Sequence, residues 1–232
     1  MAETEKTNDA IQALTKISQA ITSELYLDDI LKLIVTVTAE ALGSKICTLM
    51  LLNEKGELII KASQSLSEQY LKKPPLKIGE GIAGKVVEDK KPITILNIAE
   101  DKNYKYKEIA KKEGLISLLC VPLTVKGKVI GALDVYTDKP HIFKKSEINI
   151  LTMVANQSAV VIENTELIVK SKVIAEELES RKLIERAKGI LMKNRSMAED
   201  AAYRLIQRQA MDKRKSMKEV AEAIILVNDI RK

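Results

Sequence analysis

Residues 178–226 read LESRKLIERAKGILMKNRSMAEDAAYRLIQRQAMDKRKSMKEVAEAIIL and hold three amphipathic segments in succession. In each segment the apolar residues recur at the spacing of one helical face. Ser196 and Ser216 are each followed three residues later by a glutamate, the pattern of a helix capping box. Three short amphipathic helices can bury one small shared core, so the stretch predicts a three-helix bundle.

The net positive charge is confined to this end of the chain. All seven arginines lie from Arg181 onward, and residues 178–232 hold 14 Lys and Arg against 8 Asp and Glu. The first 177 residues hold 24 of each and are neutral. Because arginine presents a planar fork of donors that suits phosphate and stacks on bases, the pattern indicates a sensor joined to a nucleic-acid binder.

The candidate contact residues are basic or polar side chains of the bundle. Arg204 and Arg208 are four residues apart, so they share a face of the second helix with Gln207 beside them. We expect nucleic-acid contacts chiefly from Lys188, Arg204 and Arg208, with support from Arg181, Gln207, Arg214 and Lys215. The other interpretation is a solvated face that keeps the bundle soluble, and the segregation of the arginines argues against it. Charge alone does not separate RNA from DNA.

A family resemblance enters at the same residues. Ile184-Glu-Arg-Ala-Lys-Gly-Ile-Leu-Met192, residues 199–206 and residues 218–224 resemble an ANTAR domain over about 50 residues. The resemblance implies an RNA-binding module at the end of a dimeric coiled coil, which acts in transcription antitermination by holding paired RNA stem-loops. The family often has Leu-Arg, then Ser three residues on, where this chain has Ile206-Gln207 and Ala210. We expect the adjacent Arg208 to supply the guanidinium.

The N-terminal part alternates between helical and strand patterns. Residues 8–22 and a segment from Asp28 to Gly43 have helical periodicity, and the chain is helical again from Ser146. Strand-like runs occupy residues 45–52, 58–63, 93–96, 115–123 and 129–136. Hairpin-linked strands flanked by helices predict an α+β domain with an antiparallel sheet.

This part resembles a GAF domain over about residues 10–165. The residues that carry the resemblance are Ile78-Gly-Glu-Gly-Ile-Ala-Gly84, Leu119-Cys-Val-Pro-Leu123, residues 129–135 and residues 157–164. The resemblance implies a six-stranded sheet with helices on one face and a possible pocket for a small-molecule ligand on the other. GAF domains bind varied small molecules, and many bind none that is known, so the ligand stays open.

Several catalytic and cofactor sites are excluded. The G-x-G-x-x-G of residues 79–84 follows Pro74-Pro75 instead of a strand, which favours a structural turn over a dinucleotide site. His141 is the single histidine, so no histidine-based metal site or proton relay is expected. Cys47 and Cys120 lie in apolar strand-like runs and are expected to be buried reduced thiols, without bilin or haem. We expect no catalytic residue, metal or cofactor, and no enzymatic activity.

A long helix without a breaker joins the two parts. Between residues 146 and 194 there is no proline, and Gly189 is the single glycine. Two apolar stripes run along it, one from Ile162 through Val169 and Val173, the other from Val160 through Leu167 and Ile174. Both registers are compatible with the sequence and suit a parallel homodimer. The alternative is a single helix packed on its own domain.

These observations predict three parts: a GAF-like sensor over residues 1–160, a coiled-coil signalling helix over 161–180 and an ANTAR-like RNA-binding domain over 181–232. No apolar run approaches a membrane span, and the polar N-terminus lacks a signal-peptide core, so we expect a cytoplasmic protein. The predicted function is a dimeric, signal-responsive antiterminator that binds paired RNA stem-loops. The alternative is a ligand-controlled module whose basic helices dock an acidic protein partner.

Overall fold

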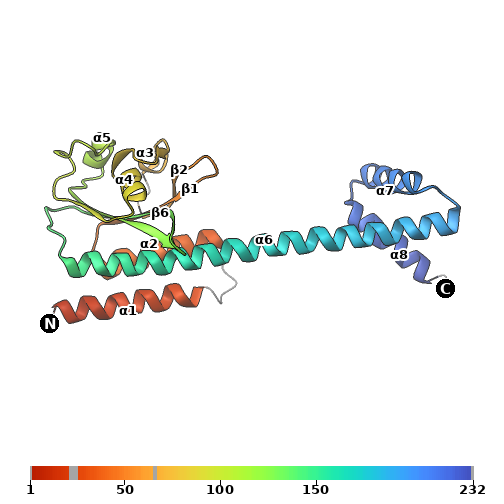
Figure 1. Ribbon diagram of the computed structural model, residues 1–232, viewed down its shortest axis with the longest axis horizontal. Helices are drawn as coiled ribbons and strands as arrows, with labels where there is room; N and C mark the ends of the chain where they lie inside the picture. Colours follow the sequence, from red (N-terminus) through yellow and green to blue (C-terminus); the bar gives the residue numbers. More distant parts are fainter. Residues whose placement is uncertain (1, 21–25, 65–66, 231–232) are drawn as a thin grey trace. The chain divides into compact units, whose positions relative to one another are not determined.

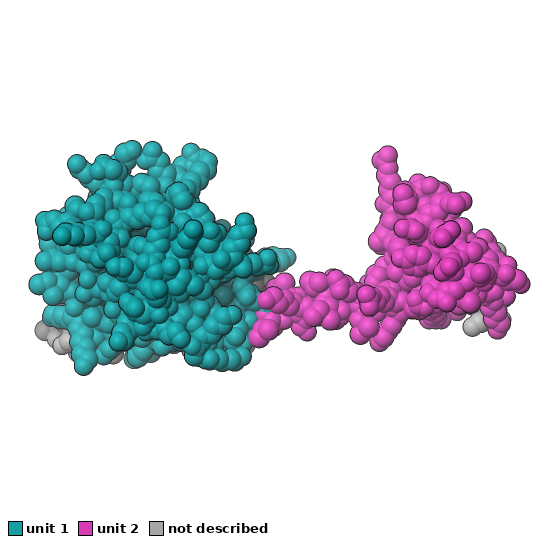
Figure 2. Space-filling model, turned by 45° about the horizontal axis from the view of Figure 1, so that its top comes forward, with its two compact units in different colours: residues 1–166 teal, residues 167–232 magenta. Residues whose placement is uncertain are grey.

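The computed structural model describes residues 2–20, 26–64 and 67–230. The chain divides into two compact units, Met1–Glu166 and Leu167–Lys232 (Figure 2). Helix α6, Lys145–Arg195, contributes its first part to unit 1 and its last part to unit 2.

Unit 1 is built on one antiparallel sheet of six strands in the order β3-β2-β1-β6-β5-β4. The strands are β1 Ile46–Leu52, β2 Glu57–Ser63, β3 Leu76–Lys77, β4 Ile93–Ile95, β5 Ser117–Val125 and β6 Lys128–Thr137. The predicted α+β class is confirmed. The two-residue β3 was missed because it follows Pro74-Pro75 and is too short to show an alternating pattern.

Helices cover both faces of the sheet (Figure 1). On one face lie α2 Leu27–Leu42 and the first part of α6, and α1 Ala2–Ala20 packs against α2 and joins the same core. Three short helices, α3 Glu68–Leu71, α4 Gly81–Asp89 and α5 Lys107–Lys112, cover the other face. Since side chains alternate along a strand, Cys47 joins the core under α1, α2 and α6, whereas Cys120 joins the core under the short helices.

The glycine-rich turn of residues 79–84 leads into α4. Gly79 and Gly81 have φ of +82° and +64°, a conformation that other residues rarely adopt. A Cβ atom on Gly84 would lie 2.4 Å from the carbonyl oxygen of Lys77. These glycines therefore serve the close approach between the turn and its own helix.

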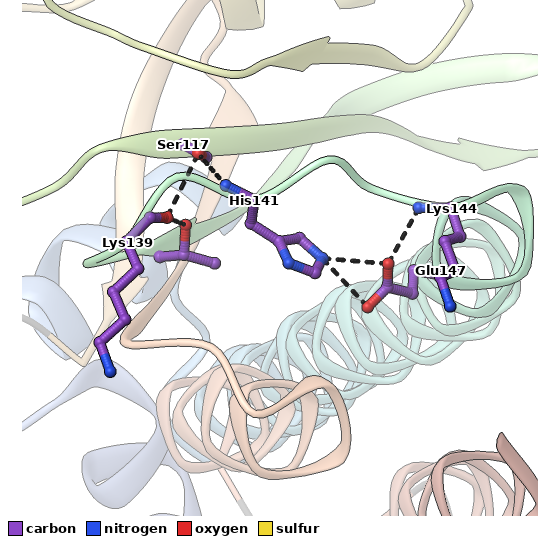
Figure 3. Close-up of polar contacts among 6 residues, drawn as sticks. Ser117, Lys139, His141, Lys144 and Glu147 are labelled. Atoms are coloured by element: carbon purple, nitrogen blue, oxygen red, sulfur yellow. Dashed lines mark hydrogen bonds and ion pairs between the residues drawn. The ribbon is translucent and has the colours of Figure 1, made fainter. Parts of the chain in front are cut away.

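The start of α6 is fixed by the buried carboxylate of Glu147 (Figure 3). His141 Nε2 lies 3.0 Å and 3.2 Å from its two oxygens, and the backbone N–H of Lys144 donates to it at 2.9 Å. The backbone N–H of His141 donates to Ser117 Oγ on β5 at 2.8 Å, and its ring packs edge-to-face on Phe143. His141 is a loop residue, as predicted, and it links the sheet to the first turn of α6.

Unit 2 is the predicted three-helix bundle, made of the end of α6 with α7 Glu199–Lys213 and α8 Met217–Ile230. Its core consists of Ala187, Leu191, Ala202, Ile206, Ala221 and Ile225. At α8 the predicted capping box is present, because Glu219 N donates to Ser216 Oγ at 3.1 Å and Ser216 N donates to Glu219 Oε2 at 2.8 Å. At α7 it is wrong: the N-cap is Ala198, and Ser196 adopts φ +51° outside the helix.

The middle of α6 carries the two predicted apolar stripes on its surface. Leu167, Val169, Val173, Ile174 and Leu178 are all exposed, with Ile174 at 65%. In the described part of the chain, no helix has an apolar stretch long enough to span a lipid bilayer.

Candidate ligand pocket and nucleic-acid interface

A small polar pocket lies in unit 1 between the sheet and the short helices. The free space is about 30 Å³, room for one or two water molecules. The polar residues that line it come from three places: Thr48, Asp134 and Tyr136 from β1 and β6, Tyr70 and Lys73 from α3 and the loop after it, and Tyr104, Lys105 and Tyr106 from the segment before α5.

The hydroxyl groups in this pocket are partly paired with one another. The hydroxyls of Thr48 and Tyr70 lie 2.8 Å apart, and Tyr136 OH donates to Asp134 Oδ2 at 3.2 Å. The rings of Tyr70 and Tyr136 meet edge-to-face, with centroids 6.3 Å apart. Burial raises the pKa of Tyr70, Tyr104 and Tyr136 above the ordinary value, so these phenols remain neutral at physiological pH.

Asp134 is the carboxyl group at the base of the pocket, only 4% exposed. Its Oδ1 accepts no hydrogen bond from any residue that the structure describes. Burial raises the pKa of this carboxyl, against the opposing effects of the Cys120 thiol, the Lys73 charge and the Tyr136 hydroxyl. An unpaired buried oxygen is costly, so the site favours a further hydrogen-bond donor.

Lys73 supplies the cation of the pocket. Its Nζ lies 3.3 Å from the centroid of the Tyr70 ring and 5.7 Å from that of Tyr106. Burial lowers the pKa of Lys73 to about 8, in spite of the attraction of Asp134 and Glu113. The ammonium group is therefore held against aromatic rings in a place where its charge is poorly solvated.

The resemblance implied a possible pocket on this face of the sheet, but sequence reasoning named none of its lining residues, although two signals point to them. Four of the chain's six tyrosines line it, in a protein with one phenylalanine and no tryptophan. Asp134 also interrupts an apolar strand, Val-Ile-Gly-Ala-Leu-Asp-Val, and a carboxylate is rarely buried in such a strand unless it has a partner.

In unit 2, α7 presents a polar outer face. Arg204, Gln207, Arg208 and Met211 are exposed and follow the spacing of one helical face. Among the described residues, no carboxylate pairs with Arg204 or Arg208. The predicted pair therefore stands free of internal partners on the surface of the bundle.

The other predicted contact residues are placed differently. Lys188 is only 7% exposed, and its Nζ lies 2.8 Å from Glu185 and 2.7 Å from Glu199. These hydrogen bonds raise the pKa of Lys188 and lower that of Glu199. A contact from Lys188 to RNA, which stays a prediction, requires the release of both carboxylates. Lys215 is exposed and pairs with Glu219 at 2.7 Å.

Arg181 is exposed on α6, and Arg214 is the exposed C-cap of α7 in the left-handed conformation. Other cations form ion pairs between the helices of the bundle: Arg186 pairs with Asp229 at 2.9 Å, and Lys218 pairs with Glu179 at 3.3 Å. The structure thus sorts the basic residues into those that bind the bundle together and those that face solvent.

A groove of about 720 Å³ runs between the three helices of unit 2. Leu205, Val220 and Ile224 form its apolar part, and Arg195 and Lys213 contribute positive charge from α6 and α7. Sequence reasoning missed Arg195 and Lys213 as candidates, because the packing of α8 against the other two helices defines the groove.

No group of three metal-ligating side chains comes together within residues 2–20, 26–64 and 67–230. Two candidate sites remain among the described residues: the polar pocket in unit 1 and the basic surface with its groove in unit 2.

Comparison with known families places both units. Residues 24–163 match the GAF domain family, and residues 173–225 match the ANTAR domain. Because the first match spans more than half of the chain, the protein belongs to the GAF domain family, and it carries an ANTAR domain at its C-terminal side. Both resemblances seen in the sequence are confirmed.

Solved structures agree on the fold of unit 1. The GAF domain of a phosphoenolpyruvate-protein phosphotransferase from Coxiella burnetii is 26% identical with a TM-score of 0.62, covering 70% of this chain and 97% of that one. A free methionine-R-sulfoxide reductase from Neisseria meningitidis has a TM-score of 0.58 over 68% of this chain and 91% of that one. At 18% identity, the second likeness shows the fold alone.

Curated relatives match one unit at a time. The Nif-specific regulatory protein of Herbaspirillum seropedicae is 27% identical over 154 residues, which are 64% of this chain and 28% of that protein. The transcriptional regulatory protein PdtaR of Mycobacterium tuberculosis is 52% identical over 52 residues, 22% of this chain and 25% of that protein. The nitrate regulatory protein of Klebsiella oxytoca is 46% identical over 50 residues, 22% and 13% of the two chains. The chain spans less than a third of each relative's length.

Proposed function

We propose that this protein is a cytoplasmic regulator of transcription antitermination, in which unit 2 binds RNA stem-loops and unit 1 senses a small molecule. The observation that carries the RNA assignment is the outer face of α7. There Arg204 and Arg208 have no partner among the residues that the structure describes, and they stand beside Gln207 and Met211. Guanidinium groups suit phosphates and unstacked bases, and an apolar side chain suits a base face.

The relatives support the same assignment. The segment that contains α7 lies within the ANTAR match and is about half identical to a stretch of two proteins named as regulators. Arg195 and Lys213 add positive charge to the groove, and the apolar part of the groove offers room for an unpaired base. RNA loops expose their bases, whereas the deep major groove of an A-form helix hides them.

We further propose that two copies pair in parallel through the exposed apolar residues of α6, from Leu167 to Leu178. Apolar stripes on a helix without a breaker favour such pairing. Two copies present two basic surfaces, so one RNA with tandem hairpins binds both. A ligand in unit 1 that prefers one arrangement of the α6 pair shifts the population toward it.

The test is retention of short RNAs at about physiological salt, with tandem hairpins, single hairpins and matched DNA in one pool. The wild-type chain is expected to retain tandem hairpins selectively. Arg204→Ala/Arg208→Ala should weaken RNA binding at least tenfold without loss of helicity. Lys102→Ala/Lys111→Ala, which removes two exposed charges from unit 1, is the matched control. Equal affinity of the two double variants for RNA would refute the α7 assignment. Capture of an acidic protein that unrelated RNA does not displace would favour the alternative, in which the basic helices dock a protein partner.

A further inference from the structure

The pocket of unit 1 is an aromatic enclosure in a protein that is poor in aromatic residues. Tyr70, Tyr104, Tyr106 and Tyr136 all line it, and three of them are buried. The faces of phenol rings carry negative electrostatic potential and attract cations. A group of such rings around one space is the arrangement by which proteins bind organic ammonium groups.

The protein already places an ammonium group there. Lys73 Nζ sits 3.3 Å above the Tyr70 ring and within reach of Tyr106. Its backbone lies in the loop between α3 and β3, next to the exposed Pro74-Pro75. Because the side chain is tethered to this loop, its ammonium reaches the ring but gives no hydrogen bond to Asp134 Oδ1.

Asp134 provides the second half of the site. Its carboxyl is buried at the base of the pocket, one oxygen accepts from Tyr136, and the other has no donor among the described residues. A ligand with an N–H group would satisfy that oxygen. An anionic ligand would meet this carboxyl instead, and Lys105, which also lines the pocket, is already paired with Glu80.

We propose that the pocket binds a small organic cation, a primary ammonium group on a short alkyl chain, which displaces the Lys73 ammonium from the tyrosine rings and donates a hydrogen bond to Asp134. Lys73 acts as the built-in occupant that keeps the pocket closed. The free space of about 30 Å³ admits no such ligand until Lys73 withdraws. This inference rests on the proposal that unit 1 is a ligand sensor, and it names the class of that ligand.

The loop that carries Lys73 is hydrogen-bonded to a second segment that covers the pocket. Tyr106 OH donates to the carbonyl oxygen of Pro74 at 2.8 Å, so the loop after Lys73 is tied to the segment that leads into α5. A ligand that displaces Lys73 therefore moves two segments that cover the pocket.

The experiment is chemical rescue of the full-length Lys73→Ala variant with n-butylammonium, a primary ammonium one methylene longer than the three-carbon ammonium fragment that the substitution removes. Thermal unfolding is followed against probe concentration. The expected result is a saturable rise in Tm of roughly 2–4 °C at about five times the dissociation constant of the probe. Butanol and butyrate, which lack the cation, should give no rise, and Lys73→Ala/Asp134→Asn should lose it.

Lys72→Ala is the matched control, because Lys72 is the exposed neighbour and pairs with Glu68 outside the pocket. An equal response of Lys72→Ala and Lys73→Ala, or no response of Lys73→Ala, overturns the inference. If Lys73→Ala does not fold, the wild-type chain is titrated with n-butylammonium at pH 7 and pH 9, with tyrosine resonances as the readout. Stronger binding at pH 9, where Lys73 is largely neutral, supports the inference, and no binding at either pH overturns it.

RNA retention is measured on the same preparations. A variant that binds RNA but shows no amine response removes this inference and leaves the RNA assignment intact. A variant that binds the amine but not RNA supports this inference and contradicts the RNA assignment.

Discussion

Lys188 Nζ lies 2.7 Å from Glu199 Oε1, which ties the last turns of α6 to the first turn of α7. The same ammonium binds Glu185 at 2.8 Å, so one nearly buried cation holds two carboxylates. Lys188→Ala is expected to lower the Tm of unit 2 more than Lys193→Ala, an exposed lysine of the same helix.

A further variant, Lys188→Met, separates a structural role from RNA contact. A lysine that contacts phosphate adds about one to the slope of log affinity against log salt. If Lys188 contacts RNA as predicted, the folded Lys188→Met variant should show a slope reduced by about one. An unchanged slope would assign Lys188 to the packing of the bundle alone.

Glu219 makes the stability of unit 2 dependent on acid. Lys215 and the capping contacts of Ser216 lower the pKa of Glu219 to about 2, from an ordinary value near 4.5. Between these values the unfolded chain binds more protons than the folded one, so stability falls as pH falls through this window. Glu219→Gln should lower the Tm at pH 6 and reduce the loss between pH 6 and pH 3. Parallel curves for the two proteins would contradict this.

Lys73 makes the stability of unit 1 rise with pH as well, but in an alkaline window. Its pKa of about 8 in the folded chain lies below the ordinary value of 10.5, so between these values the unfolded chain binds the extra proton and stability rises with pH. Lys73→Met should be more stable than the wild type at pH 7 by roughly 1–2 kcal/mol. The gain should shrink at pH 9.5. Urea unfolding at the two pH values tests this, with Lys72→Met as the control.

Replacement by alanine should change the free energy of unfolding in opposite directions at two glycines, one in strand β6 and one in helix α6. A Cβ on Gly131 in β6 would lie 2.0 Å from the carbonyl oxygen of Met50, so Gly131→Ala should destabilise unit 1 by about 2–4 kcal/mol. Gly189 lies on exposed helix with no atom near its Cβ position, so Gly189→Ala should stabilise α6 by roughly 0.5–1 kcal/mol. Calorimetry of both variants measures the two effects.

The proposed homodimer has its own test. Ile174 is 65% exposed in the middle of α6, so Ile174→Glu should convert a dimer into a monomer by placing like charges at the contact. Lys172→Glu, which changes the charge of an exposed neighbour, is the control. Light scattering after gel filtration gives the masses. An unchanged mass for Ile174→Glu would exclude this contact.

The sequence predicted the elements better than the sites. Helical periodicity and the Ser216 cap located the three-helix bundle, because these signals are local. Arg181, Lys188 and Arg195 recur every seven residues along α6, but Lys188 turns inward because Glu199, the first residue of α7, meets it. That carboxylate was predicted to cap α7 with Ser196. A partner from another helix competes for it, and no local pattern shows such a partner.

The pocket was hidden for the same reason. Asp134 was visible as an interruption of an apolar strand, but the tyrosines around it come from three segments of the chain, at positions 70, 104–106 and 136. Their convergence depends on how α3 and the segment before α5 cover the second face of the sheet, which is a property of tertiary packing.

The two cysteines lie on opposite sides of one sheet, each sealed in its own core. Burial raises the pKa of both thiols, so neither reacts while its layer is closed. In chains that keep only Cys47 or only Cys120, the rate of labelling by a thiol reagent therefore measures how often the layer that covers that thiol opens. The ratio of the two labelling rates tells whether the layer of short helices over the pocket opens by itself or only when the whole unit unfolds.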